Sequence, residues 1–234
     1  MTKKTLRIAS YNIRKARGLD QKRRPERTVQ VINGLEADVV VLQEADKRLG
    51  QRHPALPRAM IEAETDFELV EVCANDISLG WHGNAMLVRK GLGVRDITRL
   101  DLPGFEPRGA VRMILDIAGG VTVVATHLGL LRRDRRAQLA VLAQATVSDA
   151  HVIMAGDFNE WSPDKGFEPL SDRFETCSPG RSFHARRPMA ALDRFALSHG
   201  IEMRDAGVEQ GELARIASDH LPIWSDVVVP SSTC

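Results

Sequence analysis

The sequence predicts an α/β protein built around a mixed β-sheet, or around two sheets that pack face to face. At the N-terminus a segment that alternates as a strand does, a segment with helical spacing and an apolar run follow one another over residues 6–44, which is typical of a βαβ unit. Four strand-length runs separated by Gly, Pro and Asp lie between residues 83 and 126. Gly119 and Gly120 separate the last two runs and predict a hairpin, so we expect this part of the chain to be antiparallel. Parallel and antiparallel neighbours together indicate a mixed arrangement.

Each element of the N-terminal half follows from its own pattern. Residues 6–13 alternate as a strand does, and Val29 and Ile32 have helical spacing after Pro25, a residue favoured in the first turn of a helix. The apolar run before Glu44 has the length of a buried strand. We expect a helix at residues 28–35, a loop with a short helix between 45 and 80, and strands at 6–13, 38–44, 67–73, 83–89, 94–102, 109–117 and 121–126.

The C-terminal half is expected to contain one long helix and three further strands. The helix runs from residue 132 to about 147, with Leu139, Leu142 and Ala143 as its buried stripe. Its four arginines predict either a solvated face or a basic rim that attracts a phosphorylated substrate. Pro and Gly mark residues 162–188 as a loop. We expect strands at residues 152–155 and 190–198 and a last strand that ends near Val229.

Composition excludes several classes of protein. The chain has 234 residues, a hydrophobic content of 43% and a net charge of +1, so any attraction to phosphate must be local. Cys73, Cys177 and Cys234 are widely spaced, which argues against a disulfide framework and for a reducing compartment. Residues 1–10 lack the apolar core of a signal peptide, and no stretch approaches the roughly 20 apolar residues that span a bilayer. We expect a cytoplasmic protein.

The best candidate for a functional site follows the apolar run at residues 152–155. Gly156 allows a tight turn there, and Asp157 and Asn159 come directly after it. Polar groups at the carboxyl end of a buried strand are where open sheets build sites. A carboxylate beside a carboxamide suits the binding of a hard cation or the orientation of a water molecule. The alternative is a plain turn, because Gly, Asp and Asn are common turn residues.

Other polar residues stand at the ends of apolar runs or inside them. These are Asn12, Glu44, His127, Asp193, and the adjacent pair Asp219 and His220. Taken singly, each has an ordinary reading as a turn former, a loop acid or a hydrogen-bonded histidine. Asp193 lies inside an apolar run, and burying a carboxylate is costly unless it is paired or bound to metal. A carboxylate next to His220 suggests a fixed imidazole tautomer.

Together these residues occur in a characteristic order. The motifs are Ser-Tyr-Asn12-Ile, Leu-Gln-Glu44, Gly83-Asn84-Ala, Thr-His127-Leu, Gly-Asp157-Phe-Asn159, Leu-Asp193-Arg and Ser-Asp219-His220. Their ordered set resembles the endonuclease/exonuclease/phosphatase superfamily over almost the whole chain. The resemblance implies one domain over residues 1–234 with a four-layer α/β sandwich, in which two mixed sheets pack face to face with helices outside. It also implies cleavage of a phosphate ester with Mg²⁺, for which Mn²⁺ can substitute.

The resemblance also assigns roles to the candidate residues. Glu44 is implied as the principal metal ligand, with Asn12 beside it, and Asp219 either approaches the metal or orients His220. Asp157 is implied to orient or deprotonate the attacking water, with Asn159 as a phosphate contact. His127 and His220 would stabilise phosphoryl charge or assist proton transfer, and Asp193 would support a catalytic histidine. The chemistry agrees, because a hard cation and imidazolium offset the negative charge of an in-line attack.

Arg194 is a departure from the family pattern, which often has an aromatic residue or histidine after the aspartate. Its planar guanidinium could bind phosphate in a fork, so we count it with Asn12, His127, Asn159 and His220 as a predicted phosphate contact. The leading hypothesis is a phosphodiesterase or phosphatase acting on a small or lipid-linked phosphate ester. The alternatives are a nuclease acting on DNA or RNA and a non-catalytic binding module on the same fold.

Overall fold

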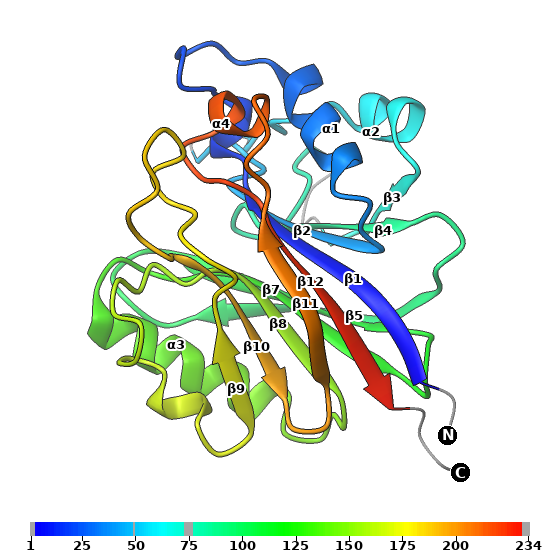
Figure 1. The fold of residues 1–234 in the computed structure, drawn as a ribbon, viewed down its shortest axis with the longest axis vertical. Helices are drawn as coiled ribbons and strands as arrows, with labels where there is room; N and C mark the ends of the chain where they lie inside the picture. The colour runs from blue at the N-terminus through cyan, green and yellow to red at the C-terminus, as the bar shows by residue number, and fades with distance from the viewer. Residues whose placement is uncertain (1–2, 49, 73–76, 231–234) are drawn as a thin grey trace.

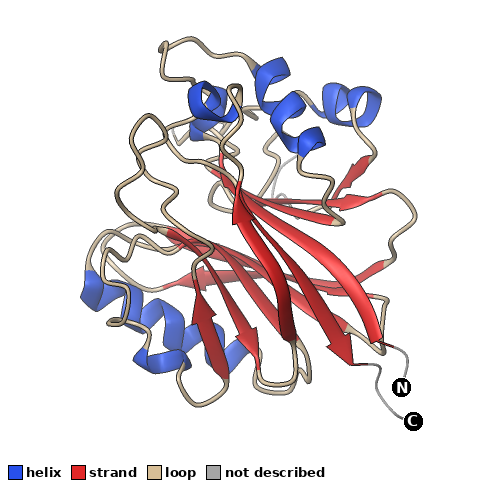
Figure 2. Cartoon of the chain, in the orientation of Figure 1, coloured by secondary structure: helices blue, strands red, loops and turns tan. Residues whose placement is uncertain are grey.

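Two six-stranded sheets packed face to face form the centre of the molecule (Figures 1 and 2). The computed structural model describes residues 3–48, 50–72 and 77–230. Its elements are β1 (Lys3–Asn12), η1 (Arg14–Ala16), α1 (Pro25–Gly34), β2 (Val39–Gln43), α2 (Arg58–Glu64), β3 (Phe67–Leu69), β4 (Ala85–Arg89), β5 (Val94–Leu102), β6 (Arg108–Leu115), β7 (Val121–His127), α3 (Arg132–Ala145), β8 (Val152–Asp157), η2 (Glu168–Leu170), β9 (Phe174–Cys177), β10 (Asp193–Ser198), β11 (Glu202–Val208), α4 (Ala214–Ala217) and β12 (Ile223–Pro230).

Helices cover the outer face of each sheet. The first sheet has the strand order β11-β12-β1-β2-β4-β3, and α1, α2 and α4 pack on its outer side. The second sheet has the order β5-β6-β7-β8-β10-β9, and α3 packs on its outer side. The predicted four-layer α/β sandwich with mixed sheets is therefore confirmed.

The interior strands β2, β7 and β8 are buried on both faces. In β8, Ile153 and Ala155 lie in the core between the sheets, whereas Val152 and Met154 pack toward α3. Side chains alternate between the two faces of a strand, so a strand covered on both sides reads as a continuous apolar run. This burial accounts for the uninterrupted run that the sequence shows before Asp157.

Parallel pairing brings the carboxyl ends of four strands to the site. β1 runs parallel to β2, and Asn12 is in register with Gln43. In the second sheet β7 runs parallel to β8, with His127 beside Asp157. β10 is antiparallel to β8, and its first residue, Asp193, is also in register with Asp157. Polar residues that are remote in the sequence are therefore gathered at one edge of the sandwich.

The structure corrects several predicted element boundaries. The strand predicted at residues 67–73 is three residues long, and Cys73 lies outside the described residues. The predicted loop at 162–188 contains η2 and the edge strand β9. β11 was not predicted, because its sequence Glu-Met-Arg-Asp-Ala-Gly-Val is largely polar and none of its residues is buried. Edge strands carry a weak hydrophobic pattern because one face or edge meets solvent.

The hairpin predicted at Gly119 and Gly120 joins β6 and β7, which pair antiparallel. Both glycines have positive φ, as tight turns of this kind require. The described part of the chain contains no helix long and apolar enough to cross a membrane. Cys177 is a free thiol, while Cys234, like Cys73, lies outside the described residues.

Candidate active site

The carboxylate of Asp157 lies at the centre of a buried polar cluster where the two sheets meet. Asn12, the last residue of β1, donates a hydrogen bond from Nδ2 to Asp157 Oδ2 at 3.1 Å. The Nε2 atoms of His127 and His220 lie 3.5 and 3.7 Å from the same oxygen. None of these four residues is more than 6% exposed. The structure therefore brings together four predicted site residues from both ends of the chain.

Asp193 anchors the His220 ring from the side opposite Asp157. Its Oδ2 lies 2.8 Å from His220 Nδ1, and Ser182 donates its hydroxyl to the same oxygen. Asp193 is completely buried, and its Oδ1 has no hydrogen-bond partner among the described residues. A carboxylate on Nδ1 fixes the orientation of the imidazole and directs Nε2 toward Asp157.

Burial and neighbouring charges set the protonation states of these groups. Burial raises the pKa of Asp157 to about 6. Burial opposes the charge of His220, but the carboxylates of Asp193 and Asp157 outweigh it and raise the pKa of His220 to about 10. At His127, burial and the cations Arg108 and His220 together hold the pKa well below its usual value. Near neutral pH the site therefore combines an imidazolium, a neutral imidazole and a carboxyl group that titrates close to the working pH.

Several non-glycine residues around the cluster have positive φ angles. They include Arg14 (47°), Lys15 (57°), Glu44 (54°) and Asn159 (52°). Each such residue costs of the order of 1–3 kcal/mol and persists only where the surrounding structure holds it. Such strain concentrates at functional sites. The strained backbone here lies in the connections that follow β1, β2 and β8.

The carboxylates of Glu44 and Asp219 and the Asn12 carboxamide all contact the turn that follows β1. Lys15 pairs with the Glu44 carboxylate, and Arg14 Nε lies 3.2 Å from Asp219 Oδ2. The backbone N–H of Arg14 donates to Asn12 Oδ1 at 3.1 Å. Each oxygen group is thus matched by a cationic or N–H partner. Oxygen donors of this kind suit Mg²⁺, so the residues present fit a divalent cation.

A second group of possible metal ligands lies within the buried cluster itself. Ligand atoms of Asp157, Asp193 and His220 all lie within 4.8 Å of one another, and the three residues are buried. This group could also hold a metal ion. It differs from the first set because it contains an imidazole nitrogen, a ligand that suits transition metals better than Mg²⁺.

Asn159 is held in place by hydrogen bonds of its own. Its backbone N–H donates to Asp157 Oδ1 at 2.9 Å, and its Nδ2 donates to the carbonyl of Leu128 at 2.8 Å. These contacts tie the loop after β8 to the loop after β7. The Asn159 side-chain N–H is therefore occupied by a backbone carbonyl, and the residue lies beside the Asp157 carboxylate.

Arg194 is not brought to the cluster. Successive residues of a strand point to opposite faces, so Arg194 points away from Asp193. It is 3% exposed, stacks on Phe167 at 4.7 Å and donates to the carbonyls of Glu160 and Ser162. Its position favours a structural role, and we do not carry it into the proposed function.

The predicted arginine run on α3 is neither fully solvated nor a free basic rim. Arg132 and Arg135 both bind the buried carboxylate of Glu160, with contacts of 2.6–3.0 Å. Arg133 pairs with Asp134, and Arg136 Nε lies 3.5 Å from Glu168. The Glu160 pairs connect the start of α3 to the loop that carries Asn159.

Replacing Glu160 by glutamine is expected to lower the free energy of unfolding by about 3 kcal/mol, because it leaves the buried Arg135 without a carboxylate to balance its charge. Burial opposes the Glu160 charge, but Arg132 and Arg135 outweigh it and lower the pKa from 4.5 to about 2. Its contribution is therefore complete above pH 4.5 and is lost as the pH falls toward 2. Urea unfolding between pH 3 and 7 measures both effects.

Glu168→Gln is the matched control, since Glu168 is exposed and its ion pair with Arg136 is a surface contact. A surface pair contributes at most about 1 kcal/mol. Equal losses in the two variants would show that the Glu160 pairs do not support the fold.

Sequence reasoning missed two kinds of site residue. Ser182 lies in a loop without periodic pattern, and nothing in the sequence indicated its bond to Asp193. Lys15 and Arg14 were visible as a basic stretch after Asn12, but their pairing with Glu44 and Asp219 depends on the strained turn between them.

Comparisons with known proteins agree with this architecture. Uncharacterized protein YbhP of Escherichia coli K12 is 31% identical over 162 residues, so the match spans 63% of this chain and 63% of the length of that relative. The mannosyl-6-phosphatase Bt3783 of Bacteroides thetaiotaomicron has a TM-score of 0.74 and 18% identity, covering 95% of this chain and 99% of that chain. TDP2 of D. rerio, complexed with a single-strand DNA product, has a TM-score of 0.70 and 18% identity, covering 95% of this chain and 98% of that chain.

The two solved structures show a shared fold. The family itself follows from the model of the Endonuclease/Exonuclease/phosphatase family, which matches residues 9–220. The matched region includes every residue of the Asp157 cluster. The chain therefore belongs to the endonuclease/exonuclease/phosphatase family.

Proposed function

We propose that this protein is a metal-dependent phosphoesterase that hydrolyses a phosphodiester or phosphomonoester by in-line attack of water, on a small or lipid-linked phosphate ester. One observation carries the proposal. A buried carboxyl group with a raised pKa, Asp157, lies between two histidines of opposite protonation state at the meeting point of both sheets. Family membership supports the reaction class, because the family consists of hydrolases acting on phosphoester bonds.

Asp157 is the proposed general base. Oδ2 accepts one hydrogen bond, from Asn12, and both histidine Nε2 atoms lie beyond ordinary hydrogen-bond length, so a lone pair of this oxygen remains to accept a proton. As the water oxygen forms its bond to phosphorus, the water proton passes to Asp157, and the bond to the leaving oxygen breaks. The leaving oxygen takes a proton from solvent. A base with a pKa near the working pH is the most effective at such a transfer.

The two histidines are proposed to stabilise charge in different ways. His220 is an imidazolium held by Asp193, and it offsets the negative charge that builds on the phosphoryl oxygens. His127 is neutral and contributes an N–H donor. Asn159 is proposed to border the phosphate beside Asp157, and Asp193 acts as a positioning residue.

Glu44, Asn12 and Asp219 are proposed to hold the divalent cation, Mg²⁺ or in its place Mn²⁺. We favour this set over Asp157, Asp193 and His220 because its donors are all oxygens and because Asp157 then remains free to act as the base. When bound, the cation supplies positive charge against the phosphoryl oxygens.

Hydrolysis of bis-p-nitrophenyl phosphate and p-nitrophenyl phosphate with Mg²⁺, Mn²⁺ or EDTA tests the proposal. We expect metal-dependent turnover that falls at least about 100-fold in Glu44→Gln. Even mutating a residue that only hydrogen-bonds to a metal ligand lowers metal affinity or activity by about 10–100-fold. Glu62→Gln, on the exposed side of α2, is the matched control. Turnover that EDTA leaves intact, or that survives in Glu44→Gln, contradicts the proposed metal site.

A nuclease is the second candidate, because the positive charge of the basic pocket described below could also bind a neighbouring phosphate of a nucleic-acid backbone. DNA or RNA cleavage with binding that weakens steeply with added salt would support this activity, because phosphate contacts release counterions. Activity against neither the esters, a plasmid nor phospholipids would favour a non-catalytic binding module.

A further inference from the structure

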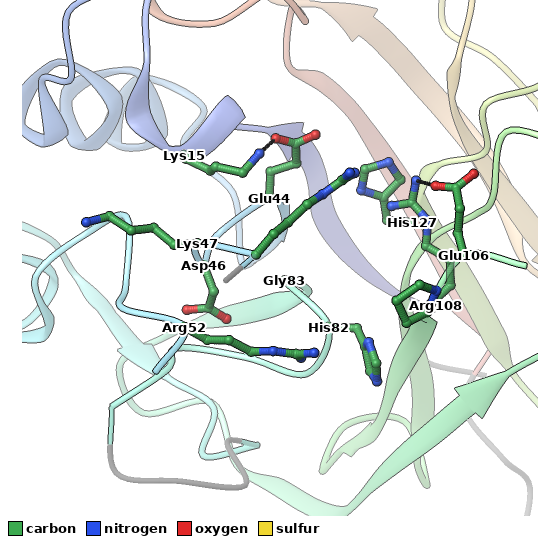
Figure 3. A pocket seen from close by; sticks show the side chains of 12 residues that line it. Lys15, Glu44, Asp46, Lys47, Arg52, His82, Gly83, Glu106, Arg108 and His127 are labelled. Carbon is green, nitrogen blue, oxygen red and sulfur yellow. Dashed lines mark hydrogen bonds and ion pairs between the residues drawn. The ribbon is translucent and has the colours of Figure 1, made fainter. Parts of the chain in front are cut away.

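A pocket of 250 Å³ opens beside the Asp157 cluster (Figure 3). It is lined by Lys15, Glu44, Asp46, Lys47, Arg48, Arg52, His82, Gly83, Glu106, Pro107, Arg108 and His127. We call it the basic pocket. Glu44 and His127 belong to both the pocket and the proposed active site, so a ligand in the pocket is a direct neighbour of the scissile phosphate. Figure 3 shows His127 and Arg108 across the pocket from Lys15.

The lining carries an excess of positive charge. Five basic side chains face three carboxylates, and each of the carboxylates is already engaged. Glu44 pairs with Lys15, and Glu106 accepts from Arg108 at 2.8 Å. Asp46 accepts hydrogen bonds from the backbone N–H groups of residues 79 and 80 at 2.7 and 3.1 Å. Its carboxylate is therefore bonded to the backbone and not to the basic side chains of the pocket.

Three arginines of the pocket have unused hydrogen-bonding capacity. No hydrogen bond or ion pair joins the side chains of Arg48 or Arg52 to another residue in the described part of the chain. Arg108 is 7% exposed, and its buried Nε has no partner among those residues. The charges act on one another across the pocket: burial and then Arg52 lower the pKa of His82, and burial with Arg48 outweighs Glu106 and lowers the pKa of Arg108.

The pocket wall is a closed loop. Lys47 donates its backbone N–H to His53 at 2.9 Å, and Ala55 donates to Ala45 at 2.7 Å. Arg52 and His82 have positive φ angles of 52° and 49°. These hydrogen bonds hold the backbone from which the Lys47, Arg48 and Arg52 side chains extend.

We propose that the basic pocket binds a second phosphate group of the substrate, so that the preferred substrates are small esters carrying two phosphates. Guanidinium groups bind phosphate oxygens in a planar fork, and several of them around one anion suit a phosphate better than a carboxylate. The volume is below the roughly 300–1,000 Å³ of sites for drug-sized ligands, so the pocket suits an anionic group rather than a nucleobase. This inference rests on the proposed function only in one respect, namely that the phosphate to be cleaved lies in the proposed active site.

Three phosphate monoesters with the same three-carbon linker test the pocket: propanediol bisphosphate, hydroxypropyl phosphate and carboxypropyl phosphate. We expect the wild type to hydrolyse the bisphosphate with a kcat/KM at least about 10-fold above that of the hydroxypropyl ester, from charge-assisted hydrogen bonds to the second phosphate. In the double variant Arg48→Gln/Arg52→Gln this preference is expected to fall toward one. Arg204→Gln, an exposed arginine on β11, is the matched control and keeps the preference.

The outcomes separate the two proposals. Equal kcat/KM values for the bisphosphate and hydroxypropyl esters, or a preference that survives in the double variant, overturn the inference. A carboxypropyl ester as good as the bisphosphate overturns the assignment to phosphate. If the wild type hydrolyses neither these esters nor the two p-nitrophenyl esters, the proposed function fails by itself. Calorimetric binding of propanediol bisphosphate then decides: about 10-fold weaker binding in the double variant supports the pocket, and unchanged binding overturns it.

Discussion

Replacing Asp157 by asparagine is expected to lower kcat by at least about 1,000-fold, within the 10²–10⁴ range of general-base contributions. Asparagine keeps the shape and the contact with Asn12 but cannot accept the proton of the attacking water. Steady-state hydrolysis of the preferred ester at saturating Mg²⁺ measures the loss. Asp205→Asn, on the exposed face of β11, provides the control for a change of acid to amide.

The same variant is expected to keep its stability. The pKa of Asp157 is raised by burial from 3.8 to about 6, so its negative charge destabilises the folded state increasingly as the pH rises from about 4 to 6. Removing that charge offsets the loss of its attraction to His220, which still pairs with Asp193. Thermal unfolding at pH 7 measures this. A large loss of stability, or turnover above a tenth of the wild-type value, would argue against Asp157 as the base.

The Asp193→Asn variant is expected to lose about 10–100-fold in kcat, the usual effect of removing a carboxylate that orients a catalytic group. Asparagine cannot balance the charge of the imidazolium, so the pKa of His220 should fall from about 10. The alkaline limb of the pH profile should move to lower pH, because His220 then loses its proton at a lower pH. NMR titration of the His220 ring in metal-free protein measures the same fall in pKa independently of catalysis.

Ser182→Ala is the matched control for Asp193. It removes one hydrogen bond to Asp193 Oδ2 but leaves the carboxylate and its contact with His220. We expect a loss below about 10-fold and a His220 pKa that stays raised, since a single neutral hydrogen bond is worth only about 1 kcal/mol. If both variants leave the His220 titration where it is in the wild type, Asp193 does not set the protonation of His220.

The interior strands could be predicted because their physical cause is local. The runs that became β2, β7 and β8 are apolar along most of their length, and burial on both faces requires that composition, whereas β1 was predicted from its alternation. Two of the four edge strands, β9 and β11, were not predicted. β9 and β11 are stabilised by pairing with β10 and β12, and their exposed sides place little demand on the sequence.

The placement of Asp157, His127, Asp193 and His220 shows how far the candidate site could be anticipated. The sequence set these residues at the ends of buried runs and inside one, and the structure gathers them within a few ångströms. Arg194 shows the opposite case. It follows Asp193 directly, but the alternation of the strand sends it to the other face, where it stacks on Phe167.

The sequence by itself determined which residues are available for chemistry and, through the apolar runs, which of them stand at strand ends. Only the tertiary structure decided which of these act as a unit and with which charge. Asn12 and Asp157 are 145 positions apart and touch because the two sheets pack face to face. The raised pKa of Asp157, the lowered pKa of His127 and the basic pocket all arise from burial among neighbours that packing supplies, and no local pattern encodes that environment.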